Sequence, residues 1–132
     1  MPTLQFACDI TEADVRAAHA CASRHTFYEE AGSRPANLAL SLLAVAQSLA
    51  VRLQTRLHLM AAGHQDHDTM VMIRNEWNDL MCCVEPWQGK ELFDEERFRI
   101  VEHMNEAGAA SRAYALGQAR KFAAGATLPD RP

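Results

Sequence analysis

The sequence has 132 residues, 48% of them hydrophobic, and a formal net charge of −4 at pH 7. This length and apolar content are typical of one soluble domain that buries a single core. The negative balance argues against direct nucleic-acid binding, because neutralising phosphates requires a basic surface.

The four cysteines predict reduced thiols and a cytoplasmic location. They are Cys8, Cys21, Cys82 and Cys83, and they form no CxxC motif. Cys82 and Cys83 are adjacent and cannot readily form a disulfide with each other in a helix. The first residues, MPTLQFACDITE, lack the basic and apolar regions of a signal peptide. The uncharged stretch 36–51 is only sixteen residues long and contains polar side chains, so we expect no membrane span.

The first helix is predicted to begin at Thr11. Asp14 follows three residues later, and this spacing resembles a capping box, in which the hydroxyl accepts a hydrogen bond from an early backbone N–H. The helix should continue to about Glu30. Gly32 and Ser33 then end it, and Pro35 suits the first turn of the next helix.

The second helix is predicted to be unusually long. Residues 35–62 contain no internal glycine or proline, and a helix of this length would measure about 40 Å. Leucines and alanines occupy two of its sides, among them Leu49, which suits a central position between other helices. Because a domain of this size cannot cover so long a helix completely, we expect a homodimer.

Later segments predict two or three more helices. One should run from about Asp68 to Val84 with Trp77 on its buried stripe, followed by a loop around Trp87. Another should start near Phe93 and bury Phe98, Ile100, Val101 and Met104, with Gly108 breaking it before a final alanine-rich helix. The predicted fold is all-α, a four- or five-helix bundle with a long central second helix. Residues 1–126 form one helical domain, and residues 127–132 form a flexible tail.

The sequence offers weak signs of metal binding and catalysis. His58, His64 and His67 lie close together in sequence, and imidazole is a ligand for zinc or iron. However, no HExxH occurs and no glutamate precedes a histidine by three residues. We therefore assign no metal, cofactor or catalytic residue, and metal binding by a helical bundle stays an alternative. Cys21 and His25 share a helix face, but no oxyanion-binding element accompanies them.

The strongest functional sign is an acidic middle region. Residues 66–106 contain eleven acids against four lysines and arginines. We expect a protein-binding site at Trp87, Asp94, Glu95 and Glu96, with Trp87 either folded back as a lid or exposed as an anchor. The prediction is a non-enzymatic adaptor, regulator or inhibitor whose protein partner has a basic surface. Phage and mobile-element accessory proteins fit this description. A further alternative is a small-ligand sensor with a pocket lined by methionines and Trp77.

Overall fold

The structure is a computed structural model that describes residues 2–26, 34–63 and 66–125. It contains four helices: α1 (Glu12–Thr26), α2 (Arg34–Ala61), α3 (His67–Val84) and α4 (Glu106–Gly125). Two short 3-10 turns, η1 (Ala7–Asp9) and η2 (Glu85–Trp87), complete the described elements, and no strand occurs among them. The predicted all-α bundle with a long second helix is confirmed. The predicted end of the first helix near Glu30 and the tail 127–132 lie outside the described residues.

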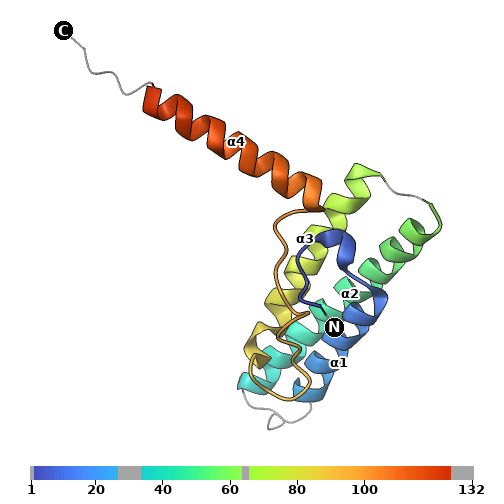
Figure 1. Cartoon of the computed structure of the whole chain (residues 1–132). Helices are drawn as coiled ribbons and strands as arrows, with labels where there is room; N and C mark the ends of the chain where they lie inside the picture. Colours follow the sequence, from blue (N-terminus) through green and yellow to red (C-terminus); the bar gives the residue numbers. More distant parts are fainter. Residues whose placement is uncertain (1, 27–33, 64–65, 126–132) are drawn as a thin grey trace.

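Helices α1, α2 and α3 pack side by side and form the body of the molecule (Figure 1). Within it α2 contacts both of the other helices, as its predicted central position requires. Its inward side carries Leu43, Ala46, Leu49 and Leu53, all buried. Its other sides still expose apolar side chains, including Val45 and Val51. The small alanine side chains let the neighbouring helices approach closely, which concentrates the core along α2.

Two helices of the body begin at side-chain caps. At α1 the Thr11 N–H donates to Asp14 Oδ2 at 2.9 Å, and the Asp14 N–H donates to Thr11 Oγ1 at 3.2 Å. This reciprocal pair confirms the capping box. At α3 the side chain of Asp66 accepts a hydrogen bond from the Thr69 N–H at 2.7 Å. Both caps satisfy backbone donors that lack partners inside the helix.

The prediction of a helix that starts near Phe93 is wrong. Residues 88–105, which we call the strap, follow an irregular path over the body, with turns and bends over 88–92 and 95–98 and an extended stretch over 99–103. Side chains of α3 replace helical hydrogen bonds there. Trp77 Nε1 donates to the Arg99 carbonyl at 2.8 Å, and Asn78 both donates to and accepts from the backbone of Val101 at 2.9 Å. These contacts hold residues 99–101 of the strap against α3.

The strap also pairs with the first residues of the chain. The Leu4 N–H donates to the Glu96 carbonyl at 2.8 Å, and the Ala7 N–H donates to the His103 carbonyl at 3.1 Å. Phe98 becomes buried as predicted, whereas Ile100 is 64% exposed and does not enter the core. The strap therefore covers the body with a few separate side chains, Arg97, Phe98 and Val101, rather than with one continuous helical face.

Helix α4 projects from the body (Figure 1). It starts next to the end of the strap, where Asn105 Oδ1 accepts a hydrogen bond from the Gly108 N–H at 2.8 Å. Gly108 lies inside the first turn, so the predicted break at this glycine is absent. None of the residues of α4 is buried, and the helix makes no packing contact with α1, α2 or α3. At about 1.5 Å per residue, its 20 residues extend roughly 30 Å.

Candidate functional site

Trp87, one of the predicted contact residues, is buried with 8% of its surface exposed. It lies in η2, directly after α3, and folds back against α1. There its ring stacks on His25, with the ring centroids 5.4 Å apart and the planes 23° from parallel. Of the two positions expected for this side chain, folded back or exposed, the structure shows the folded-back one. Trp87 is not available on the surface as an anchor for a partner.

The three predicted acids differ in their surroundings. Asp94 is half-buried, and its Oδ1 accepts hydrogen bonds from the backbone N–H groups of Glu96 and Arg97, both at 3.1 Å. Its role is therefore to cap a single turn of the strap. Glu95 is exposed, and Glu96 is exposed but accepts a hydrogen bond from the hydroxyl of Thr3. Of the three, Glu95 and Glu96 present charge to solvent.

A buried ion pair that the sequence does not reveal holds the turn at residues 94–97 against the body. Arg97 and Asp14 are 4% and 3% exposed. The guanidinium binds both carboxylate oxygens, at 2.9 and 2.7 Å, and also donates to the carbonyls of Pro2 and Asp9, both at 2.9 Å. Burial alone would raise the pKa of Asp14, but hydrogen bonds and charge from Arg97, together with Thr11, outweigh burial and lower it. This network fixes the strap to the start of α1.

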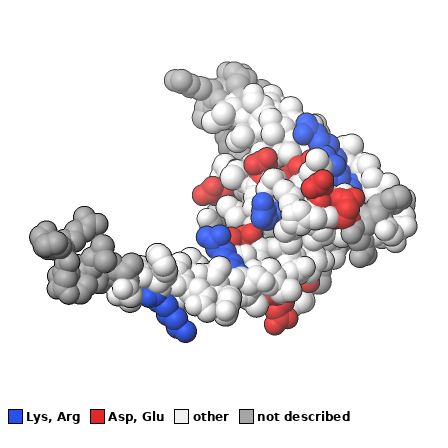
Figure 2. All heavy atoms as spheres, turned by 90° about the horizontal axis from the view of Figure 1, so that it is seen from above, with Lys and Arg blue, Asp and Glu red and all other residues white. Residues whose placement is uncertain are grey.

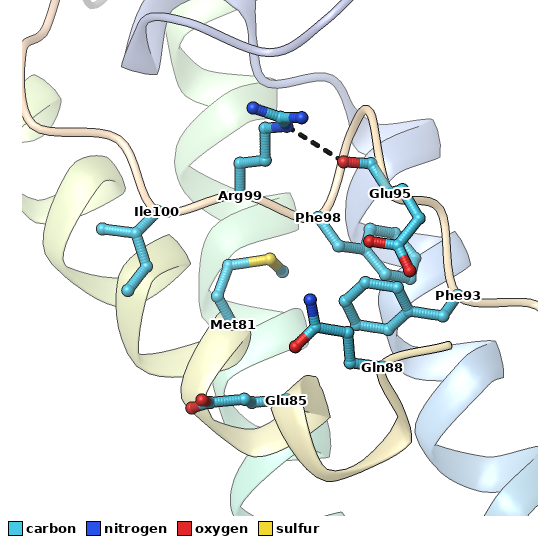
Figure 3. A pocket seen from close by; sticks show the side chains of 8 residues that line it. All are labelled: Met81, Glu85, Gln88, Phe93, Glu95, Phe98, Arg99 and Ile100. Carbon is cyan, nitrogen blue, oxygen red and sulfur yellow. Dashed lines mark hydrogen bonds between the residues drawn. The ribbon is translucent and has the colours of Figure 1, made fainter. Parts of the chain in front are cut away.

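A surface pocket lies between the strap and the end of α3 (Figure 3). Its volume is about 260 Å³. The floor is apolar and the rim is polar and charged, with the lining residues Met81, Phe93, Phe98, Ile100, Glu85, Gln88, Glu95 and Arg99. We call it the acid-rimmed pocket, since its rim carries two carboxylates against one guanidinium. An apolar floor below carboxylates suits a side chain or segment that is both apolar and cationic.

The geometry of the acid-rimmed pocket is set by contacts within the strap. Phe93 and Phe98 meet edge to face, with their ring centroids 5.2 Å apart. Arg99 Nε donates to the Glu95 carbonyl at 2.9 Å, the contact drawn as a dashed line in Figure 3. The same view shows Met81 in the middle of the lining residues, with Glu85 on one side and Arg99 on the other. The pocket thus depends on the strap, whose path the sequence did not predict.

Helix α4 carries the largest exposed aromatic side chains of the described residues. Phe122 is 78% exposed and Tyr114 is 69% exposed. They share a helix face with Lys121, because positions 114, 121 and 122 are spaced by seven and eight residues. In Figure 2, α4 reaches out from the body with basic side chains near its outer end, while acidic and basic side chains are mixed over the body. This aromatic and basic face is the second candidate contact surface.

Charge separates the two surfaces. Residues 1–105 contain fifteen acids and nine lysines and arginines, a net charge of −6, whereas residues 106–132 contain two acids and four bases, a net charge of +2. Sequence reasoning treated the final helix as part of the bundle and missed this face. The available signals were the change in the sign of the charge and the lack of a one-sided apolar stripe in residues 106–125.

The metal and nucleophile hypotheses gain no support from the described residues. His58 and His67 are exposed, His64 lies outside the described part of the chain, and no group of three or more histidines, cysteines or acids is arranged there as a metal site. Burial raises the pKa of the Cys21 thiol to about 11, so this thiol stays protonated at neutral pH. His25 contacts the backbone carbonyl of Glu91 through Nε2.

A second cavity, of about 430 Å³, lies where α2 ends and α3 begins. Three methionines from separate parts of the chain line it, together with Cys8 and His67: Met60, Met70 and Met104. The predicted sensor pocket combined methionines with Trp77, but Trp77 is fully buried in the core and does not reach this cavity.

In the part of the chain that the structure describes, no helix combines the length and hydropathy that crossing a membrane requires. Comparison with models of known protein families, with curated proteins and with solved structures finds no match to this chain.

Proposed function

We propose that the chain is a non-enzymatic protein-binding module, an adaptor, regulator or inhibitor of a protein partner. The single observation that carries the proposal is α4, a projecting helix of 20 residues with no buried side chain and two exposed aromatic rings. An isolated helix of this length is only marginally stable in water, because most helical stability in proteins comes from packing. A binding partner would supply the packing that the chain's own body does not.

The exposed aromatic side chains are suited to this role. Tyrosine and phenylalanine contribute large apolar areas to interfaces, and a helix that places them on one face can dock into a groove. Tyr114 and Phe122 lie two turns apart on such a face, with Lys121 beside Phe122. We therefore assign recognition to this face of α4.

The acidic surface is the second part of the proposal. Glu95 and Glu96 are exposed and lie on a body with a net charge of −6, which would steer a partner with a basic surface during association. Trp87 is left out because it is buried. A cytoplasmic location belongs to the same proposal, supported by four cysteines that are all free thiols.

Comparative affinity capture from the native host tests the role of α4. The full-length chain serves as bait beside a variant in which Tyr114 and Phe122 are both replaced by serine. A variant with Ala115→Ser and Ala119→Ser is the matched control, because it changes the same helix without removing a large side chain. We expect the wild type and the control to retain the same protein and the aromatic variant to lose it. Equal capture by all three baits would refute recognition through α4.

A small-ligand sensor is the second candidate, favoured by the methionine-lined cavity of about 430 Å³. Methionine side chains adapt to ligands of different shapes, which is why they are common in adaptable binding sites. A thermal-shift screen of apolar small molecules tests this function, because a ligand that binds only the folded state raises the melting temperature. Replacing Met70 with glutamate should abolish any shift that arises in this cavity.

A further inference from the structure

We propose that the partner of α4 is a second copy of this chain, and that each α4 docks at the acid-rimmed pocket of the other copy. The inference rests on the proposed function, and it names the partner for the α4 face. The result is a symmetric dimer in which the two projecting helices are exchanged. Such closed, isologous pairing is the commonest arrangement of soluble oligomers.

Charge complementarity supports a second copy as the occupant. The segment that contains α4 has a net charge of +2, and the rest of the chain has a net charge of −6. A basic helix and an acidic body on the same chain attract each other, but here the helix points away from its body (Figure 2). The acidic body of another copy meets the same electrostatic requirement without moving the helix.

The start of α4 explains why the helix does not reach its own pocket. Asn105 accepts hydrogen bonds from the backbone of the first turn, and Arg112 pairs with Glu102 of the strap at 3.3 Å. These contacts aim α4 outward from the body (Figure 1). The acid-rimmed pocket lies at the opposite end of α3, beside Met81 and Glu85.

The chemistry of the α4 face matches the acid-rimmed pocket. Phe122 offers an aromatic ring to the apolar floor, and its neighbour Lys121 offers a cation to the carboxylates of Glu85 and Glu95. The pocket volume is about 260 Å³, whereas a cavity of about 150 Å³ is enough to hold benzene. Tyr114, two turns earlier on the same face and 69% exposed, extends the contact along the body.

Charge reversal on both surfaces tests the proposal. The body variant carries Glu85→Lys and Glu95→Lys. The helix variant carries Arg120→Glu and Lys121→Glu, since Arg120 is the exposed residue next to Lys121 and adds to the positive charge at this end of α4. Each variant alone places like charges across both contacts of the dimer, so each should be a monomer at tens of micromolar. A mixture of the two restores opposite charges at both contacts, so a dimer containing one of each should form. Light scattering gives the mass, and an affinity tag on one variant shows which chains pair.

Two further variants separate charge from packing. Arg16→Glu with Arg52→Glu changes the net charge as much as the helix variant does, but on exposed positions of α1 and α2, and should leave the dimer intact. Phe122→Ala should raise the dissociation constant of the dimer about thirtyfold, as expected for an aromatic side chain at the centre of an interface.

Two results would overturn the proposal. One is a wild-type mass equal to a single chain of 14.7 kDa at every concentration up to hundreds of micromolar. The other is a dimer that both charge-reversed variants retain. If the chain is monomeric but still captures another protein through Tyr114 and Phe122, the inference fails and the proposed function stands. If neither self-association nor capture depends on α4, both fail.

Discussion

The buried pair of Arg97 and Asp14 gives the sharpest prediction about stability. Replacing Arg97 with methionine keeps an unbranched apolar stem but removes the charge and all the donors of the guanidinium. The carboxylate of Asp14, 3% exposed, would then be buried without its partner, and the carbonyls of Pro2 and Asp9 would lose a charged donor. Removing one member of a buried pair costs about 3–5 kcal/mol. Because domains of this size are stable by about 5–15 kcal/mol, the loss is a large part of the total.

The pH dependence of the effect follows from the lowered pKa of Asp14. A carboxyl group whose pKa is lower in the folded state than in the unfolded state contributes stability that is present above its unfolded pKa of about 3.9. That contribution is lost as the pH falls through the folded value. The free energy of unfolding, measured with urea and circular dichroism, should therefore separate wild type from Arg97→Met most at pH 7. The difference in the free energy of unfolding between the two proteins should become smaller near pH 3.

Two controls complete the test. Arg99→Met removes a guanidinium that is exposed and donates to the Glu95 carbonyl, and it should cost less than about 1 kcal/mol. The double variant Asp14→Leu with Arg97→Met removes both charges and should recover much of the loss, as apolar replacements of buried pairs often do. If Arg97→Met costs less than about 1 kcal/mol, or costs the same at pH 7 and pH 3, the reasoning from an unpaired buried carboxylate is refuted.

Three further predictions address the core, a helix cap and the thiols. Leu49→Asp buries a carboxylate between α2 and the helices that pack against it, so we expect aggregation or a loss of several kcal/mol; soluble protein with unchanged helicity would contradict the central position of α2. Thr11→Ala should cost only about 1 kcal/mol in urea unfolding, the contribution of one helix cap, and a much larger loss would show another role. A thiol reagent should modify Cys8 and Cys82 in the native protein and the two buried cysteines only after denaturation, whereas rapid modification of all four would contradict the core.

The parts of the fold that the sequence predicts correctly are those determined by neighbouring residues. The start of α1 depends on Thr11 and Asp14, three residues apart, and the start of α3 depends on Asp66. The length of α2 follows from an uninterrupted run of helix-forming residues. In each case the partners of the backbone groups lie within one turn, so local spacing contains the information.

The strap could not be predicted because its partners are distant in sequence. Asn78 pairs with the backbone of Val101 and Trp77 with the carbonyl of Arg99, more than twenty positions away, and Arg97 binds Asp14 across 83 positions. Together these contacts outweigh the helical tendency that the apolar spacing suggests. The acid-rimmed pocket was missed for the same reason, since the strap forms one of its walls. The buried position of Trp87 depends likewise on His25, a residue of another helix.

The pairing of the strap with the first residues also sets an order of assembly during synthesis. The Leu4 N–H donates a hydrogen bond to the carbonyl of Glu96, and the Cys8 N–H donates one to the carbonyl of Met104. The N-terminal segment therefore cannot form these hydrogen bonds until nearly a hundred later residues have been synthesised. Closing so long a loop is slow, and until then the apolar side chains beneath the strap face water. Helix α4 leaves the ribosome immediately after that closure becomes possible. Any docking of α4 at the acid-rimmed pocket therefore requires the strap to be in place first, because the strap forms one wall of that pocket.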